Sequence, residues 1–324
     1  MATTVRARSN PQTLLIAHRG ACGYLPEHTL EAKALAYGMG ADFLEQDVVA
    51  SRDDHLVVMH DIHVESVTDI AQHFPARARD DGHYYARDFD LDELKMLNVH
   101  ERRDKNGLSA VFPRRFPTTK GHFAIATLAE EIEMIQGLNT ASGGNVGIYP
   151  EIKRPAWHRA HGVDLSRLLL DTLHEFGYSH KQHKVFIQCF DAGELVRLRT
   201  ELRCEMKLVQ LIGENSWGES DTDYDLLQTG EGLQRVAAVA EAIGPWAEQL
   251  YTTARIDGQP VSTSLVSAAH AAGLQVHPYT FRADALFPGF ESFDAMVKWF
   301  VEKLRIDGLF SDFPDLARAA LDSS

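Results

Sequence analysis

LLIAHRGACGYLPEHTLEA, residues 14–32, passes from an apolar strand through a polar turn into a segment of helical spacing. The apolar run ends at Ala17, and His18, Arg19 and Gly20 follow at once. In a parallel α/β barrel the end of a strand faces the active site, so His18 and Arg19 are candidate functional residues. Alone, a His-Arg pair would more often cap a strand and form a surface ion pair, so its function depends on the rest of the chain.

Short apolar or β-branched runs alternate with longer segments of helical spacing along most of the chain. The candidate strands are Thr13–Ala17, Phe43–Val49, Leu56–Met59, Val146–Ile152, Val185–Gln188, Lys207–Leu211, Gln249–Tyr251, Leu274–Pro278 and Gly308–Phe310. The candidate helices are Leu30–Met39, Leu128–Leu138, Asp164–Phe176, Ala192–Glu201, Gly232–Ala242, Ser262–Ala272 and Phe293–Leu304. Parallel strands need crossover connections, so this order predicts an α/β fold. Roughly eight such repeats predict a (β/α)8 TIM barrel.

The stretch from His60 to His122 interrupts this order. It is rich in Arg, Asp and His, and only Leu91–Leu97 has helical spacing. Because a structureless loop of this length is unusual in a compact domain, we expect a small subdomain inserted after an early barrel strand. The predicted organisation is one barrel domain over residues 1–324, with the insertion at about 62–122. The acidic stretch Gly213–Gln228 is expected to form a long surface loop over the same barrel mouth.

Composition excludes several classes of partner. The 324 residues are 44% hydrophobic and 24% charged, which is ordinary for a globular protein. A net charge of −14 argues against nucleic acid as a partner and against stable association with anionic membranes. A small anionic substrate would therefore need a local positive site, such as a bound metal.

The cysteines and the N-terminal residues bear on the cellular compartment. Cys22, Cys189 and Cys204 are an odd number without CxxC spacing, so free thiols are expected. Residues 1–13 contain no apolar stretch of signal-peptide length, and no run approaches the length of a transmembrane helix. The sequence as it stands predicts a cytoplasmic protein, or a periplasmic one if a signal peptide has been removed.

DFLEQDVV, residues 42–49, places two carboxylates on one face of a strand. Glu45 and Asp47 are two positions apart and therefore project together. Two adjacent buried carboxylates are costly unless a cation neutralises them, and oxygen ligands favour Mg²⁺ or Ca²⁺ over zinc. The alternative is that both carboxylates face solvent, although the apolar flanks favour a buried strand.

Two further segments end in polar residues of the same kinds. HLVVMHD, residues 55–61, delivers His60 and Asp61 to a strand end. Two histidines can serve as general acid and base, and Asp61 could orient His60. GIYPEIKRP places Glu151 and Lys153 on one strand face. Glu151 would complete a three-carboxylate metal site and Lys153 would offer a positive charge to a phosphate, whereas a plain Glu–Lys pair is the alternative.

In order, AHRG, PEHT, EQDVV, VVMHD and YPEIK resemble the glycerophosphodiester phosphodiesterases, in particular their longer bacterial periplasmic-type branch. The resemblance continues through VFIQCFD, LVQLI, HPYTFR and DGLFSDFP and spans nearly the whole chain. It implies a (β/α)8 barrel with a small subdomain inserted after the HD motif. The family's common PENT element is PEHT here, with His28 in place of Asn, and this difference is expected to have little consequence.

The resemblance also implies the roles of individual residues. The expected catalytic acid and base are His18 and His60. One divalent cation, Ca²⁺ or Mg²⁺, is expected to be held by Glu45, Asp47 and Glu151. The phosphate is expected to contact Arg19 and Lys153, and the further substrate-site candidates are Gln188 and Tyr279. The implied reaction is metal-dependent hydrolysis of glycerophosphodiesters, such as glycerophosphocholine and glycerophosphoethanolamine, to sn-glycerol 3-phosphate and an alcohol. We expect a monomer or homodimer whose alcohol half-site makes few specific contacts. The resemblance does not assign which histidine is the acid and which the base. It also leaves open whether the cation is Ca²⁺ or Mg²⁺, and whether the reaction passes through a cyclic intermediate or begins with direct attack by water.

Two other functions share part of this pattern. A phospholipase D-like or sphingomyelin-cleaving enzyme would need an apolar lid, and the insertion contains no strongly amphipathic apolar loop. A non-catalytic solute-binding protein on the same fold would lack a histidine or a metal carboxylate, and all five of these residues are present.

Overall fold

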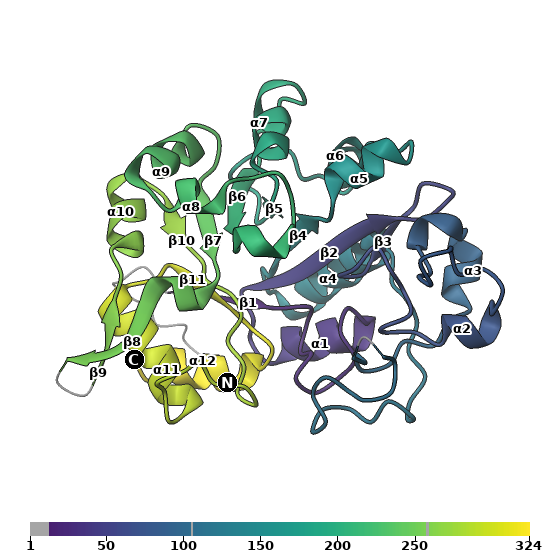
Figure 1. The fold of residues 1–324 in the computed structure, drawn as a ribbon, viewed down its shortest axis with the longest axis horizontal. Helices are drawn as coiled ribbons and strands as arrows, with labels where there is room; N and C mark the ends of the chain where they lie inside the picture. Colours follow the sequence, from purple (N-terminus) through teal and green to yellow (C-terminus); the bar gives the residue numbers. More distant parts are fainter. Residues whose placement is uncertain (1–12, 105, 257–258) are drawn as a thin grey trace.

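The computed structural model describes residues 13–104, 106–256 and 259–324. Over these residues eight parallel strands form a barrel surrounded by helices, which confirms the predicted (β/α)8 TIM barrel (Figure 1). The barrel strands are β1 (Leu14–Ala17), β2 (Phe43–Ala50), β4 (Gly147–Ile152), β5 (Phe186–Cys189), β6 (Lys207–Ile212), β7 (Ala242–Pro245), β10 (Gln275–Val276) and β11 (Gly308–Ser311). Their order in the sheet is β10-β7-β6-β5-β4-β2-β1-β11. Backbone hydrogen bonds from Asp307 N to Val276 O (2.9 Å) and from Phe281 N to Phe310 O (2.8 Å) close the barrel.

The helices pack outside the barrel, and many of them begin at a side chain that caps the first turn. They are α1 (Leu30–Gly38), α4 (Leu128–Ser142), α5 (Pro155–Ala160), α6 (Leu165–Glu175), α7 (Ala192–Thr200), α8 (Tyr224–Leu227), α9 (Gly230–Ala237), α10 (Leu265–Ala271), α11 (Phe293–Trp299) with the π-helical turn η4 (Phe300–Leu304), and α12 (Pro314–Asp322). The hydroxyl of Thr29 accepts a hydrogen bond from Ala32 N at the start of α1, and Thr127 accepts one from Glu130 N at the start of α4. Such N-caps satisfy amide groups that the helix itself leaves unpaired.

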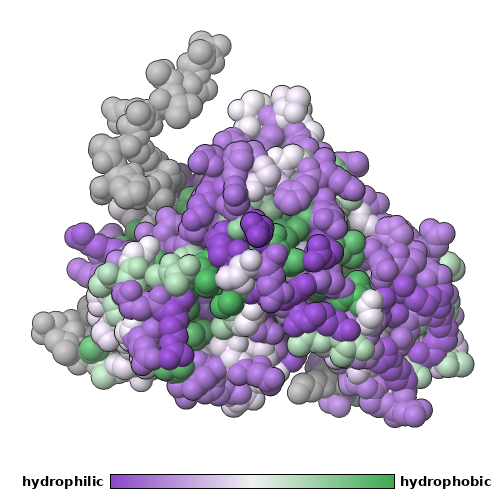
Figure 2. All heavy atoms as spheres, turned by 90° about the horizontal axis from the view of Figure 1, so that it is seen from above, coloured by the Kyte–Doolittle hydropathy of each residue, from purple (hydrophilic) through white to green (hydrophobic). Residues whose placement is uncertain are grey.

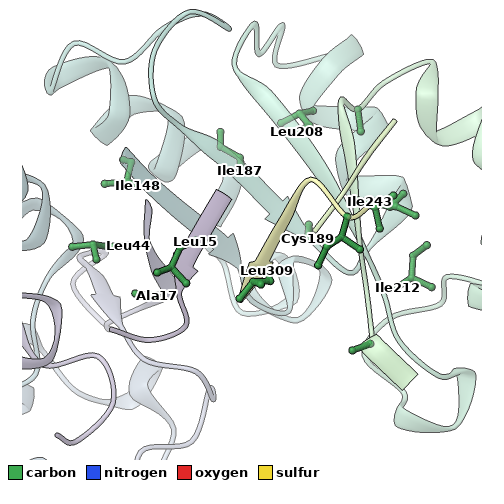
Figure 3. Close-up of a cluster of buried hydrophobic side chains, with 14 of the residues drawn as sticks. Leu15, Ala17, Leu44, Ile148, Ile187, Cys189, Leu208, Ile212, Ile243 and Leu309 are labelled. Atoms are coloured by element: carbon green, nitrogen blue, oxygen red, sulfur yellow. The ribbon is translucent and has the colours of Figure 1, made fainter. Parts of the chain in front are cut away.

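Alternation along the strands separates two layers of core. Side chains inside the barrel are Ile16, Phe43, Tyr149, Phe186, Val209, Ala242 and Phe310. Their neighbours point outward to the helices, among them Leu15, Leu44, Ile148, Ile187 and Leu208 (Figure 3). Because side chains alternate with a period of two, residues 18, 45, 47, 151 and 188 share the inward face of their strands. The fold thus directs the predicted site residues toward the barrel mouth.

Three predicted elements need correction. Leu56–Met59 is not a barrel strand: β3 (Leu56–Val58) runs antiparallel to the extended end of β2, because only a short turn joins them. The predicted helix Gly232–Ala242 stops at Ala237, and Ala242 instead begins barrel strand β7, whose short AIGP sequence gives little strand signal. Gln249–Tyr251 is not a barrel strand either. It joins the short helix η3 (Ala247–Leu250) to a hairpin of β8 (Tyr251–Ile256) and β9 (Gln259–Ser262), which forms its own two-stranded sheet.

The segment after β3 packs beside the barrel around a cluster of its own. It contains α2 (Ile70–His73), the short helix η1 (Ala86–Asp88) and α3 (Leu91–Lys95), which lie together next to β3 (Figure 1). Its buried side chains include Val64, Ile70, Phe89, Leu94 and Val99, and they pack with Val57 and Met59. An insertion after an early barrel strand is therefore confirmed, and the boundaries 62–122 within one domain of residues 1–324 stay a prediction.

The remaining expectations concern the surface and the termini. Within the described ranges, no helix has the length and apolar character needed to cross a membrane. Hydrophilic side chains cover most of the face in Figure 2, and hydrophobic ones show between them near its centre. Cys22, Cys189 and Cys204 are buried free thiols, as expected. The prediction about a signal segment falls on residues 1–12, which lie outside the described residues.

Candidate active site

A cavity of about 300 Å³ opens at the carboxyl ends of the barrel strands. All of the predicted site residues line it, namely His18, Arg19, Glu45, Asp47, His60, Glu151, Lys153, Gln188 and Tyr279. They lie in or shortly after six different strands, β1, β2, β3, β4, β5 and β10, so the fold brings together side chains from distant parts of the chain. In barrel enzymes this edge is where catalytic residues gather.

The three carboxylates lie on adjacent strands at one side of the cavity. Glu45 and Asp47 project from β2, and Asp47 is the register partner of Glu151 on β4. All three side chains are buried, so the alternative that Glu45 and Asp47 face solvent is wrong. The pairing of β2 with β4 explains why residues more than a hundred positions apart form one acidic group.

The surroundings of the three carboxylates shift their pKa values in different directions. Burial raises the pKa of Glu45 well above its usual range, and the neighbouring charge of Asp47 raises it further. Burial likewise raises the pKa of Glu151 to about 8. For Asp47, burial acts to raise the pKa, but Lys153 and His60 hold it well below its usual range. The neighbouring groups therefore stabilise the charged form of Asp47 more than they stabilise the charged forms of Glu45 and Glu151.

A divalent cation fits these residues. Asp47 Oδ1 is buried without a hydrogen-bond donor, so its lone pairs are available to a cation. The ligand atoms of His28, Glu45 and Asp47 all lie within 4.8 Å of one another. Carboxylate oxygens are the ligands that Ca²⁺ and Mg²⁺ prefer, and a bound cation would relieve the mutual repulsion of the carboxylates.

Two basic side chains face the acidic group. Lys153 Nζ lies 2.7 Å from Glu151 Oε1 and 3.9 Å from Asp47 Oδ1. The backbone N–H of Arg19 donates to Glu45 Oε2 at 2.5 Å, and its guanidinium Nε lies 3.6 Å from Asp47 Oδ2. Arg19 and Lys153 therefore place positive charge at the cavity wall, where a phosphate would need it.

His28 contacts a residue of the site, and the expectation that its place in PEHT has little consequence stays a prediction. Its Nε2 lies 2.7 Å from Asp47 Oδ2, and the side chain is buried. Burial lowers the pKa of His28 to about 3, so the ring is neutral near pH 7. Its backbone has φ +60°, a conformation that asparagine adopts readily, which explains how the family's usual residue fits the same turn.

His18 is hydrogen-bonded to Asp312, a residue that the sequence analysis did not identify. His18 Nδ1 lies 2.6 Å from Asp312 Oδ1, and both residues are buried. Asp312 Oδ2 accepts hydrogen bonds from Arg115 Nη2 (2.7 Å) and Arg282 Nε (2.9 Å). Burial lowers the pKa of His18 to about 4, with Arg19 lowering it further. The ring is thus neutral, and its Nδ1 donates to the carboxylate.

His60 has the same kind of partner. Its Nδ1 lies 2.7 Å from Asp61 Oδ1, in agreement with the hypothesis that Asp61 orients it. Asp61 Oδ2 in turn accepts from Arg102 Nη1 at 2.5 Å, and Arg102 also binds Glu27. His60 reaches the cavity because β3 turns back along β2, where Met59 N donates to Asp47 O.

The other side of the cavity is aromatic. Phe190, Trp217, Trp246 and Tyr279 line it, together with Glu219, and they follow β5, β6, β7 and β10. Except for Tyr279, sequence reasoning missed these residues, because β7 was not predicted and no motif marks the loops. The hydroxyl of Tyr279 donates to Ile212 O at 3.0 Å, and Gln188 Nε2 lies 3.5 Å from Glu45 Oε1.

Comparison with known proteins gives a consistent result. Residues 18–316 match the glycerophosphoryl diester phosphodiesterase family. The chain is 42% identical over 319 residues to the glycerophosphodiester phosphodiesterase of Haemophilus influenzae, covering 93% of this chain and 88% of that protein. It is 34% identical over 323 residues to the protein of the same name from Treponema pallidum, covering 94% and 90%. A phosphodiesterase of Oleispira antarctica, solved in complex with the product sn-glycerol-3-phosphate, has a TM-score of 0.64 at 20% identity, covering 96% of this chain and 97% of that one.

These matches bear on the sequence predictions one by one. The likeness to the Oleispira structure supports the barrel fold. Because the two sequences are only 20% identical, it supports nothing beyond the fold. The identity to the Haemophilus protein extends over most of both chains, and it confirms the predicted enzyme class. Since the family match begins at His18 and continues into the last helix, the chain belongs to the glycerophosphoryl diester phosphodiesterase family, as its sequence predicted.

Proposed function

We propose that this enzyme hydrolyses glycerophosphodiesters to sn-glycerol 3-phosphate and an alcohol, with His18 and His60 as the acid-base pair. The observation that supports this most is the pairing of each histidine with a carboxylate at the wall of one cavity. A pure binding protein has no need of two oriented imidazoles beside an acidic group, so this arrangement favours catalysis over solute binding.

The proposed cation site consists of Glu45, Asp47 and Glu151, with His28 beside Asp47. A bound Ca²⁺ or Mg²⁺ would act as a Lewis acid on a phosphate oxygen and orient the substrate. Lys153 and Arg19 would hold the remaining phosphate charge, because both already lie against the acidic group. Gln188, whose Oε1 is buried without a partner, would accept a hydrogen bond from a glycerol hydroxyl.

We assign the base to His18 and the acid to His60. Asp312 fixes the proton of His18 on Nδ1, which leaves Nε2 free to remove a proton from the attacking water. The side chain of His60 keeps 30% of its surface accessible to solvent and can be reprotonated from water. Its Nε2 would donate the proton that the departing alkoxide needs, while Asp61 stabilises the charged ring.

Turnover of glycerophosphocholine, followed by coupled detection of sn-glycerol 3-phosphate, tests the proposal. Formation of that product together with free choline is the expected result. Phosphocholine and glycerol as products would mean that the other ester bond is cleaved, and the proposed orientation of the substrate would then be wrong. A protein that releases no product from any glycerophosphodiester would contradict the proposed function.

A further inference from the structure

The cavity has two chemically distinct sides. The strands β1, β2 and β4 supply the histidine, carboxylate and lysine side chains, whereas β5, β6, β7 and β10 lead into Phe190, Trp217, Trp246 and Tyr279. The charged side satisfies the phosphate in the proposed reaction, so the aromatic side has to meet another part of the substrate. A glycerophosphodiester has two other parts, the glycerol and the esterified alcohol. Because the proposed function assigns a glycerol hydroxyl to Gln188, the esterified alcohol is left for the aromatic side.

The aromatic rings meet at steep angles and form corners rather than stacks. The ring centroids of Trp217 and Trp246 are 5.5 Å apart with an interplanar angle of 60°, and those of Phe190 and Tyr279 are 6.0 Å apart at 85°. Corners of this kind present ring faces toward a rounded group, as in sites that bind quaternary ammonium ions.

Trp217 is positioned for a ligand rather than for the core. Its side chain lines the cavity, yet 41% of the residue surface is exposed. Gly213 leaves room for it, since a Cβ at that position would lie 2.7 Å from the indole ring. A large aromatic surface left open at a cavity wall is available to a partner molecule.

One carboxylate and one guanidinium, those of Glu219 and Arg282, also line this side, and Arg282 is paired with Asp312. Glu219 lies two residues after Trp217 and lines the same cavity. Arg154 holds its loop, with Nη1 donating to Gly218 O at 2.6 Å and Nε lying 3.5 Å from Glu219 Oε2. Lys153 Nζ lies 5.8 Å from the Phe190 ring but is paired with Glu151, so Phe190 marks the boundary between the two sides.

We infer that the aromatic side binds a quaternary ammonium alcohol, so that choline esters are the preferred substrates. The inference rests on the proposed hydrolysis and names its substrate class. It departs from the sequence-based expectation that the alcohol half makes few specific contacts. Aromatic faces and a carboxylate together favour a cation that is apolar on its outside, which ethanolamine and glycerol are not.

The sharpest test compares glycerophosphocholine with the glycerophosphodiester of 3,3-dimethylbutan-1-ol, in which carbon replaces the charged nitrogen. The two esters have the same shape and differ in charge. The kcat/KM for the choline ester should exceed that for the neutral ester by about 10-fold, within the roughly 2- to 30-fold range of one cation–π contact. A ratio near one would overturn the inference.

Variants locate the effect. Trp217→Leu keeps an apolar side chain but removes the ring, and Glu219→Gln removes the charge; each should lower the ratio of choline ester to neutral ester by at least about 3-fold. Trp157→Leu is the matched control, because Trp157 lies on α5 and does not line the cavity. Its ratio should equal that of the unchanged protein. An unchanged ratio in both Trp217→Leu and Glu219→Gln would contradict the assignment of this side.

A binding measurement separates this inference from the proposed function. Choline should quench tryptophan fluorescence saturably in the full chain, 3,3-dimethylbutan-1-ol should do so more weakly, and Trp217→Leu should abolish the difference. Turnover of all diesters at similar rates would sustain the proposed function and refute the choline site. Absence of turnover together with selective choline binding would refute the proposed function but support the choline site. Absence of choline binding would overturn the inference.

Discussion

Asp312 binds His18 where β11 pairs with β1, with Oδ1 of the carboxylate 2.6 Å from Nδ1 of the ring. The two residues follow β11 and β1, the last and first strands, which pair in parallel. Arg115 from the insertion and Arg282 hold the second carboxylate oxygen. The orientation of the proposed base therefore depends on three separate parts of the chain.

Replacing this carboxylate tests that dependence. Asp312→Asn keeps the shape but can present an N–H to His18, so the ring would adopt the wrong tautomer. We expect kcat to fall by about 10²-fold or more with KM little changed, measured with glycerophosphocholine. Circular dichroism serves as the folding control. A kcat near that of the unchanged protein would remove Asp312 from the account.

The two histidines should each be needed for turnover. His18→Ala and His60→Ala should lower kcat by at least ~10²-fold, the scale of losing a positioned acid or base. His161→Ala, an exposed histidine that does not line the cavity, is the control and should retain full activity. If either cavity variant keeps near-normal kcat, that histidine has no part in proton transfer.

A buried ion pair behind the cation site should be needed for stability. Lys33 Nζ lies 2.8 Å from Glu131 Oε2 and donates to the backbone carbonyl of Glu45 at 2.5 Å, and both side chains are fully buried. Lys33→Met should lower the free energy of unfolding by about 3–5 kcal/mol, because it leaves the Glu131 charge buried and unpaired. Urea unfolding measures this loss.

The double variant Lys33→Met, Glu131→Leu distinguishes the pair from its packing. Removing both charges should recover a large part of the stability that Lys33→Met loses. A double variant that is no more stable than the single one would show that the lysine acts through Glu45 alone.

Stability should decrease on acidification because of His158. Ala50 N donates to its Nε2 (3.3 Å) and its Nδ1 donates to Arg154 O (3.1 Å), a pattern that only the neutral ring can make. Burial lowers the pKa of His158 from 6.5 to about 4. The unfolded chain therefore binds a proton below about pH 6.5 that the folded chain does not bind until about pH 4.

The loss from His158 should be about 2 kcal/mol of unfolding free energy between pH 7.5 and pH 5. His158→Gln offers a donor and an acceptor without titrating, so its stability should vary less with pH by that amount. Urea unfolding of both proteins at the two pH values makes the comparison. Parallel pH dependences would mean that the pKa of His158 is the same in the folded and the unfolded chain.

The sequence predicted the parts of the site that local alternation determines. Glu45 and Asp47 follow Phe43 on the inward face of one strand, and their spacing of two positions is visible in the sequence. The partners that orient the histidines depend on tertiary contacts. Asp312 lies 294 residues from His18, so only the closed barrel brings them together.

Other features escaped prediction for equally physical reasons. Strand propensity does not distinguish parallel from antiparallel pairing, so the sequence of β3 is indistinguishable from that of a barrel strand. β7 is four residues long and contains glycine and proline, which weaken its signal. Trp246 follows β7 directly, so the missed strand also hid one wall of the cavity.

Removal of the divalent cation tests the central claim most directly. The claim is that Glu45, Asp47 and Glu151 hold a cation that the reaction needs. Hydrolysis of glycerophosphocholine should stop in excess EDTA and return when Ca²⁺ or Mg²⁺ is added, and the same addition should raise the melting temperature of the metal-free protein. Asp47→Asn should lose both responses. Full turnover by a rigorously metal-free preparation would contradict the claim.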